Sequence, residues 1–143
     1  EERPPARIVA GGEVIDSMIT DGCVIMPGAR VERSILSPGV MVEPGALIRE
    51  SVILTGATIG PNARIDRTII DKRVRVGEGA QVGSLEASPQ HGIAMLGKKC
   101  VVPPGMTIEA GAIIGTDVNP DDYPGPTVRG DDYVQTKRLA YEV

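Results

Sequence analysis

The stretch from residue 31 to residue 70, VERSILSPGVMVEPGALIRESVILTGATIGPNARIDRTII, reads as one short phrase repeated with substitutions. Residues that lie 17 positions apart are similar along it and on both sides of it. One such series is Ser17, Ser34, Ser51 and Thr68, and another is Val14, Val31, Ile48, Ile65 and Val82. Similarity at a fixed period indicates a repeat architecture, so the period is the first guide to the fold.

Each unit of 17 divides into two sixes and a five, and an aliphatic anchor begins each part. Anchors at these spacings do not follow the 3.6-residue period of a helix, and the many β-branched residues favour short strands. Three strands per unit make a triangular prism. The anchors are Ile8, Val14, Ile19, Ile25, Val31, Leu36, Val42, Ile48, Ile53, Ile59, Ile65, Ile70, Val76, Val82, Leu96, Val102, Ile108 and Ile114.

The corners of the prism are predicted from the fourth position of the hexads, as in VEPGAL at 42–47. Glycine or asparagine at this position favours a backbone with positive φ, and a proline often precedes it. The residues concerned are Gly22, Gly28, Gly39, Gly45, Gly56, Asn62, Gly79, Gly105 and Gly111. The five-residue sides carry serine or threonine instead. We therefore expect a tighter corner there, with no left-handed residue.

Charges 17 positions apart test this register, because such residues stack about one strand spacing apart, ~4.8 Å. Two series on the five-residue side alternate in sign, so each charge is expected to face an opposite charge in the next coil. The series are Asp16, Arg33, Glu50 and Arg67, and Glu32, Arg49 and Asp66.

The fold class predicted is an all-β, single-stranded parallel β-helix, a hexapeptide-repeat solenoid of about six coils over residues 8–115. Residues 84–95 fit no hexad and are interpreted as a loop inserted at one corner. Residues 1–7 are interpreted as a linker from a missing upstream domain, and residues 116–143 as a C-terminal capping tail, because solenoids need capped ends.

Composition excludes several classes of function. The chain has 143 residues, 41% of them hydrophobic and 24% charged, with a net charge of -4, no Phe and no Trp. This balance argues against a nucleic-acid surface. We find neither an apolar run long enough to span a membrane nor a signal peptide, so no membrane partner and a cytoplasmic location are expected.

The candidate chemical groups are few. Cys23 and Cys100 occupy inward positions four coils apart, too far for a disulfide, and are expected to be buried. GEGAQVG at 77–83 follows the hexad pattern with no helix after it, which disfavours a phosphate loop. The acidic NPDD and GDD segments of the tail are interpreted as solvated rather than as metal ligands.

His91 is the single histidine and falls in the loop. Hexapeptide acyltransferases are similar in fold and use a histidine near a coil edge as general base. A solvated loop histidine is the simpler interpretation of His91.

Positive charge gathers in IIDKRVRV, residues 69–76, and a phosphorylated ligand there is an alternative to a plain solvated face. The basic residues in question are Lys72, Arg73, Arg75, Lys98 and Lys99. Val24, Met26, Met41 and Leu47 are expected to form an outward apolar patch that favours a subunit or domain contact.

RPPARIVAGGEVIDSMITDGCVI, followed by RSILSPG and IIDK, resembles the carboxyl-terminal domain of bacterial ADP-glucose pyrophosphorylase (glucose-1-phosphate adenylyltransferase) over residues 3–83. The resemblance implies a left-handed β-helix. It also implies a parent enzyme that makes ADP-glucose from ATP and glucose 1-phosphate with Mg²⁺ for glycogen synthesis. The catalytic residues of that enzyme lie outside these 143 residues, so the fragment itself would contain no cofactor.

The resemblance further implies a regulatory and oligomerisation domain. Its partners would be the upstream catalytic domain and other copies in a homo-oligomer, a tetramer in that family, with a sugar phosphate as allosteric effector. The basic residue after the ID pair, here Lys72, would contact the effector, and Arg73, Lys137 and Arg138 are further candidates. The alternative function is a hexapeptide-repeat acyltransferase with His91 as general base.

Overall fold

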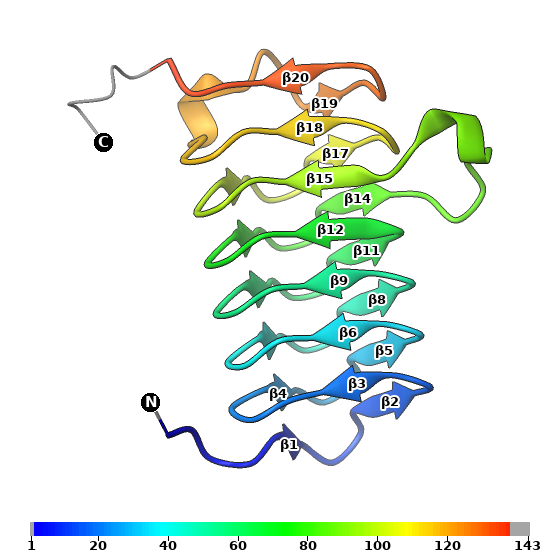
Figure 1. Cartoon of the computed structure of the whole chain (residues 1–143), viewed down its shortest axis with the longest axis vertical. Helices are drawn as coiled ribbons and strands as arrows, with labels where there is room; N and C mark the ends of the chain where they lie inside the picture. The colour runs from blue at the N-terminus through cyan, green and yellow to red at the C-terminus, as the bar shows by residue number, and fades with distance from the viewer. Residues whose placement is uncertain (1, 138–143) are drawn as a thin grey trace.

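The computed structural model describes residues 2–137, which wind into a left-handed β-helix with three parallel sheets as its sides (Figure 1). The predicted fold class is confirmed. Each of the first six turns adds one strand to each sheet, and the last turn adds one to sheets B and C, so strands that follow one another in sequence lie on different sides of the prism.

The strands are two or three residues long. Sheet A contains β1 (Arg7–Ile8), β4 (Val24–Ile25), β7 (Met41–Val42), β10 (Thr58–Ile59), β13 (Arg75–Val76) and β16 (Val101–Val102). Sheet B contains β2 (Glu13–Ile15), β5 (Arg30–Glu32), β8 (Leu47–Arg49), β11 (Arg64–Asp66), β14 (Gln81–Gly83), β17 (Thr107–Ile108) and β19 (Thr127–Val128). Sheet C contains β3 (Met18–Ile19), β6 (Ile35–Leu36), β9 (Val52–Ile53), β12 (Thr68–Ile70), β15 (Ala94–Leu96), β18 (Ile113–Ile114) and β20 (Tyr133–Val134).

The strand register follows the predicted period. Val31 lies beside Ile48, and Ile48 beside Ile65, each 17 positions further along the chain. Across the inserted loop the partner of Ile70 is Leu96, 26 positions further on. The insertion therefore lengthens one turn without shifting the alignment of the anchors.

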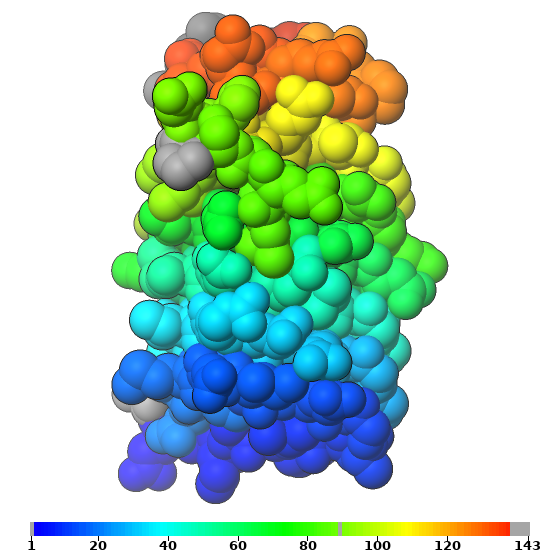
Figure 2. Space-filling model, turned by 90° about the vertical axis from the view of Figure 1, so that its right-hand side faces the viewer, coloured from blue at the N-terminus to red at the C-terminus, as the bar shows by residue number. Residues whose placement is uncertain are grey.

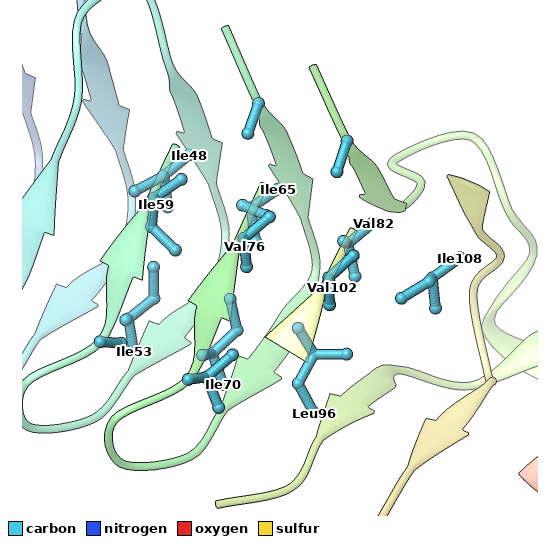
Figure 3. Close-up of a cluster of buried hydrophobic side chains, with 14 of the residues drawn as sticks. Ile48, Ile53, Ile59, Ile65, Ile70, Val76, Val82, Leu96, Val102 and Ile108 are labelled. Atoms are coloured by element: carbon cyan, nitrogen blue, oxygen red, sulfur yellow. The ribbon is translucent and has the colours of Figure 1, made fainter. Parts of the chain in front are cut away.

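The anchors form the core. Ile25, Val31, Leu36, Val42 and Ile48 have no solvent exposure, and anchors from successive turns stack in columns inside the prism (Figure 3). Complete burial of one such side chain stabilises the fold by about 1.5–3 kcal/mol, so the stacked columns supply most of the folding free energy.

The predicted corners are confirmed at all nine fourth positions. Each of these eight glycines and Asn62 has a positive φ, between 59° and 89°. The prediction for the five-residue corners is wrong, because Asp16, Arg33, Glu50 and Arg67 have φ values of 45–49°. The chain must turn within two residues there, and a left-handed residue makes that turn.

At these tight corners, serine and threonine hydroxyl groups form a ladder of hydrogen bonds to the backbone of successive turns. The Ser34 hydroxyl donates to the Glu32 carbonyl at 2.8 Å and accepts from the Ser51 amide at 3.0 Å. The Ser51 hydroxyl repeats the pattern with Arg49 and Thr68, at 2.8 and 3.1 Å. Polar backbone groups at the corner are thus satisfied although the corner is buried.

The predicted charge stacking is confirmed in part. Glu50 pairs with Arg33 at 3.2 Å and with Arg67 at 3.1 Å. Arg49 donates two hydrogen bonds to Asp66, at 2.7 and 3.0 Å. Glu32 instead lies near Arg30 and Arg33.

The outer face of sheet C is apolar along its whole length. One outward residue from each strand pairs with the next, and Met18 and Tyr133 at the two ends are 66% and 59% exposed. The column is Met18, Ile35, Val52, Ile69, Met95, Ile113 and Tyr133. The residues of the predicted patch, such as Val24 and Met41, are only partly exposed and lie on the neighbouring sheets.

The segment after residue 115 adds a 3₁₀ turn, η2 (Pro120–Asp122), and the strands β19 and β20, which extend sheets B and C. The hexad spacing did not predict these strands. In the described part of the chain, no helix has the length and apolar character needed to cross a membrane.

Candidate functional site

The inserted loop, residues 84–93, leaves the prism after β14 and returns at β15 (Figure 1). Gly83, with φ 76°, begins it, and a β-carbon at this position would fall on the carbonyl oxygen of Asp66. Only glycine fits where the backbone at residue 83 comes this close to the backbone at Asp66. A 3₁₀ turn, η1 (Pro89–His91), forms the far part of the loop, which stands out sideways from the prism in Figure 1 and lies toward the viewer in Figure 2.

A pocket of ≈ 730 Å³ lies between the loop and the outer face of sheet B. Strands β14 and β17 form its floor, Gln90 and His91 contribute from the loop, and the turn at 129–131 closes its upper side. Its polar lining residues are Gln81, Ser84, Gln90, His91, Thr107, Glu109, Arg129 and Asp131. This pocket is the candidate functional site.

His91 is the candidate base in the pocket. Its Nδ1 lies 2.8 Å from Ser88 Oγ, and its backbone amide donates to the Ser88 carbonyl at 3.0 Å. The ring is exposed to solvent. A neutral imidazole that Ser88 engages at one nitrogen can accept a proton at the other, which is the requirement for a general base.

The wall opposite the loop is charged and internally paired. Glu109 accepts hydrogen bonds from Arg129 Nη1 at 3.3 Å and from the Gly130 amide at 3.1 Å. The Arg129 amide in turn donates to Asp132. The wall thus offers both acidic and basic groups to a polar ligand.

A smaller pocket of ≈ 340 Å³ adjoins the first and shares Gln81, Gly83 and Ser84 with it. Asp66 lies in its wall and binds both Arg49 and Arg64, the latter at 3.2 Å. The hydrogen bond to Asp66 raises the pKa of Arg49 above its ordinary value. Asp66 thus holds both guanidinium groups at this end of the site.

The predicted effector residues lie elsewhere, at the corner between sheets C and A. The Lys99 amide donates to the Lys72 carbonyl and the Arg73 amide to the Thr55 carbonyl, so Lys98 and Lys99 stack on Lys72 and Arg73. Lys137 donates its amide to Asp122 beside η2, and Arg138 lies outside the described residues. Effector binding at these residues stays a prediction.

The cysteines are buried as predicted, and both are free thiols. Cys23 Sγ donates to the Ser37 carbonyl at 3.2 Å, and burial raises the pKa of Cys100 to about 12. Within residues 2–137, no group of three or more His, Cys, Asp or Glu side chains is placed to hold a metal ion.

Residues 4–95 match the family described as GlmU-like, C-terminal hexapeptide. The chain belongs to this family. Comparison with curated proteins gives no match.

Several solved structures resemble this GlmU-like chain. A hexapeptide transferase family protein from Anaplasma phagocytophilum is 11% identical, with a TM-score of 0.63 over 94% of this chain and 76% of that one. WeeI from Acinetobacter baumannii is 16% identical, with a TM-score of 0.55 over 90% and 54%. The acetyltransferase domain of PglB from Neisseria gonorrhoeae is 26% identical, with a TM-score of 0.43 over 81% and 52%. The chain spans about half the length of the last two.

These comparisons contradict the function expected from the resemblance to ADP-glucose pyrophosphorylase. The family model that matches residues 4–95 is the GlmU-like C-terminal hexapeptide family, and not a family of ADP-glucose pyrophosphorylases. The repeat explains why the resemblance suggested the wrong function. The stacking of turns determines most residues of segments such as RSILSPG, so similarity in these segments reflects the fold and not the function. A regulatory role in glycogen synthesis is therefore unsupported.

Sequence reasoning found His91 but missed its neighbours Glu109, Arg129 and Asp131. Glu109 stands at an outward hexad position that the spacing had already identified. The other two lie in the tail, where no repeat signal fixed their place. Only the pairing of β19 with β17 brings them to the pocket.

Proposed function

We propose that this chain is the β-helix of an acyltransferase, and that the pocket under loop 84–93 binds an acyl thioester and an amine or hydroxyl acceptor. His91 takes a proton from the acceptor, which attacks the thioester carbonyl. The carbon–sulfur bond then breaks and the thiolate leaves. The observation that carries the proposal is the placement of the single histidine, fixed at 2.8 Å by Ser88, in the wall of a ≈ 730 Å³ pocket.

The composition of the pocket supports this role. Strands β14 and β17 contribute Gly83 and Ile108 beside the polar Gln81 and Thr107, and such a mixed lining can accept the extended arm of a thioester donor. Glu109, Arg129 and Asp131 face it with charged groups that can orient a polar acceptor. Membership of the GlmU-like hexapeptide family is compatible with the proposal, and the likeness to solved structures supports the fold alone.

The test is binding and turnover of acetyl-CoA by the chain, with amines and alcohols as acceptors. We expect binding in the wild type, and a loss of turnover of about 10²–10⁴-fold in His91→Ala, the usual contribution of a general base. Ile93→Ala is the matched control, because Ile93 is an exposed residue of the same loop that does not line the pocket. Its turnover should stay within a few-fold of the wild type.

Two results would contradict the proposal. One is binding of fructose 1,6-bisphosphate in place of acetyl-CoA. The other is acetyl transfer that survives unchanged in His91→Ala.

We also propose that copies of the chain associate into a homo-oligomer. The outer face of sheet C supports this, because its seven-residue column includes no charged side chain and its two end residues are 66% and 59% exposed. Met95→Lys, in the middle of the column, should lower the mass measured by light scattering. An unchanged mass would exclude this face as the contact.

A further inference from the structure

The site loop begins where a column of corner residues ends. Asp16, Arg33, Glu50 and Arg67 occupy equivalent positions in four successive turns, each with φ near 45°. Arg67 is the uppermost of these four residues. The next turn has the loop in place of the corner, so Arg67 is the last member and faces the start of the loop.

Arg67 makes two contacts that differ in direction. Its Nε donates to Glu50 Oε1 at 3.1 Å, one turn below, and its Nη1 donates to the Leu85 carbonyl at 2.9 Å, in the loop above. A guanidinium group can do this because its donors point in fixed, divergent directions. Arg67 therefore joins the rigid column to the loop that carries His91.

Arg33 shows what the same residue does without a loop. It has the same φ, 46°, and donates to the same carboxylate, Glu50 Oε2, at 3.2 Å. Its second contact is Glu32, in its own turn, at 3.8 Å. The two arginines thus share backbone strain and ion pair, and differ in the contact with Leu85.

The other side-chain hydrogen bonds of the loop are local. The Glu86 amide donates to Ser84 Oγ at 3.0 Å, and Ser88 pairs with the His91 ring. These bonds shape the loop, but they do not fix it to the prism. Among the residues that the structure describes, the bond from Arg67 to Leu85 is the side-chain hydrogen bond that does.

We infer that Arg67 is a positioning residue for the proposed acyl transfer, holding loop 84–93 and thereby His91 over the pocket. Glu50 supports Arg67 from the opposite side. This inference rests on the proposed function for its effect on catalysis, whereas its effect on the loop is independent of any activity. Arg67 itself need not touch a substrate.

Hydrogen exchange of the loop amides tests the inference in the intact chain. Arg67→Ala should speed exchange of the Leu85–His91 amides by about 10- to 100-fold, the expected effect of losing a hydrogen bond to a charged group. Arg33→Ala, the matched control, should leave these amides unchanged. Arg67→Lys keeps the charge beside Glu50 but lacks the second arm, so its loop should also exchange faster while the thermal midpoint stays near that of the wild type.

Acetyl transfer gives the second readout. Arg67→Ala should lower kcat by about tenfold or more through misplacement of His91. The pH at half-maximal rate should not move, because the base is unchanged. Arg33→Ala should keep the wild-type kcat.

Failure of this inference can be told apart from failure of the proposed function. Unchanged exchange in Arg67→Ala, or equal acceleration in Arg33→Ala, would overturn the positioning role even if the chain is an active transferase. Faster loop exchange confined to the Arg67 variants would uphold the role of Arg67 in fixing the loop, even if no variant transfers an acetyl group.

Discussion

The corner between sheets B and C is regular and tight in the first four turns of the molecule and is interrupted in the fifth. In the tight turns one or two residues lie between the strands, such as Asp16 and Ser17. In the fifth turn ten residues, 84–93, stand in the same place. The strands on both sides keep their register, so the difference is confined to the corner itself.

The two corners treat polar groups differently. At the tight corner the hydroxyl groups of Ser34 and Ser51 are buried, and each donates to a carbonyl of its own turn and accepts from an amide of the next turn. At the open corner Ser88 and His91 are exposed and bond to each other beside a pocket. Stacking leaves no room for a ligand where the repeat is regular, and the interruption creates that room.

The largest expected effect concerns the core below the regular corners. Ile48→Ala should lower the free energy of unfolding by about 2–5 kcal/mol, because Ile48 has no solvent exposure and the prism cannot collapse around the cavity. Gln90→Ala in the loop should change it by less than about 0.5 kcal/mol. Denaturant unfolding of both variants measures the contrast, and equal losses would show that the loop is part of the cooperative core.

The serine ladder is expected to come next. Ser51→Ala removes the acceptor for the buried Thr68 amide and the donor to the Arg49 carbonyl, so we expect a loss of about 1–3 kcal/mol. Ser88→Ala is the matched control in the open corner, where water can replace the lost bond. A small loss of unfolding free energy in Ser51→Ala would mean that the serine hydrogen bonds form as a consequence of the stacked turns and do not stabilise them.

The sequence predicted the regular part of the molecule well because stacking imposes chemistry on every turn. An anchor such as Ile48 must be apolar, and a corner such as Gly45 must accept positive φ, so both leave a periodic trace. The left-handed backbone of Arg33 and Glu50 left no such trace. Their residue types reflect the ion pairs between successive turns. The serine that follows each of them bonds to the backbone of the corner.

The site was less predictable for a related reason. His91 was visible as a lone histidine in a segment outside the repeat, but the distance from there to Glu109 and Arg129 depends on how the loop folds back. That fold depends on tertiary contacts, such as those of Arg67 and Gly111, which no local pattern encodes. Function was inferred from phrases such as RSILSPG that stacking itself explains, and this inference was wrong.

Gly111 provides a test at the far end of the loop, with Gly105 as its control. Both have positive φ, 89° and 72°, so alanine should cost each about 1–2 kcal/mol in strain. A β-carbon at Gly111 would also fall on the His91 carbonyl oxygen, whereas nothing lies within 4 Å at Gly105. Gly111→Ala alone should therefore speed hydrogen exchange in the loop, and the same acceleration in Gly105→Ala would contradict this contact.

The smallest expected effect is that of the charge column, and it depends on pH. Hydrogen bonds from Arg67 and then Arg33 lower the pKa of Glu50 from its ordinary 4.5. The stability that Glu50 contributes is therefore present above pH 4.5 and is lost as the pH falls through the lowered value in the folded chain. Because the carboxylate is solvated, we expect Glu50→Gln to lower the thermal midpoint at pH 7 by at most about 3 °C, and by less in high salt. The midpoints of the two proteins should converge once the pH falls below the lowered pKa of Glu50, because the carboxylate is then protonated. A difference that persists there would show that Glu50 stabilises the tight corner through something other than its charge.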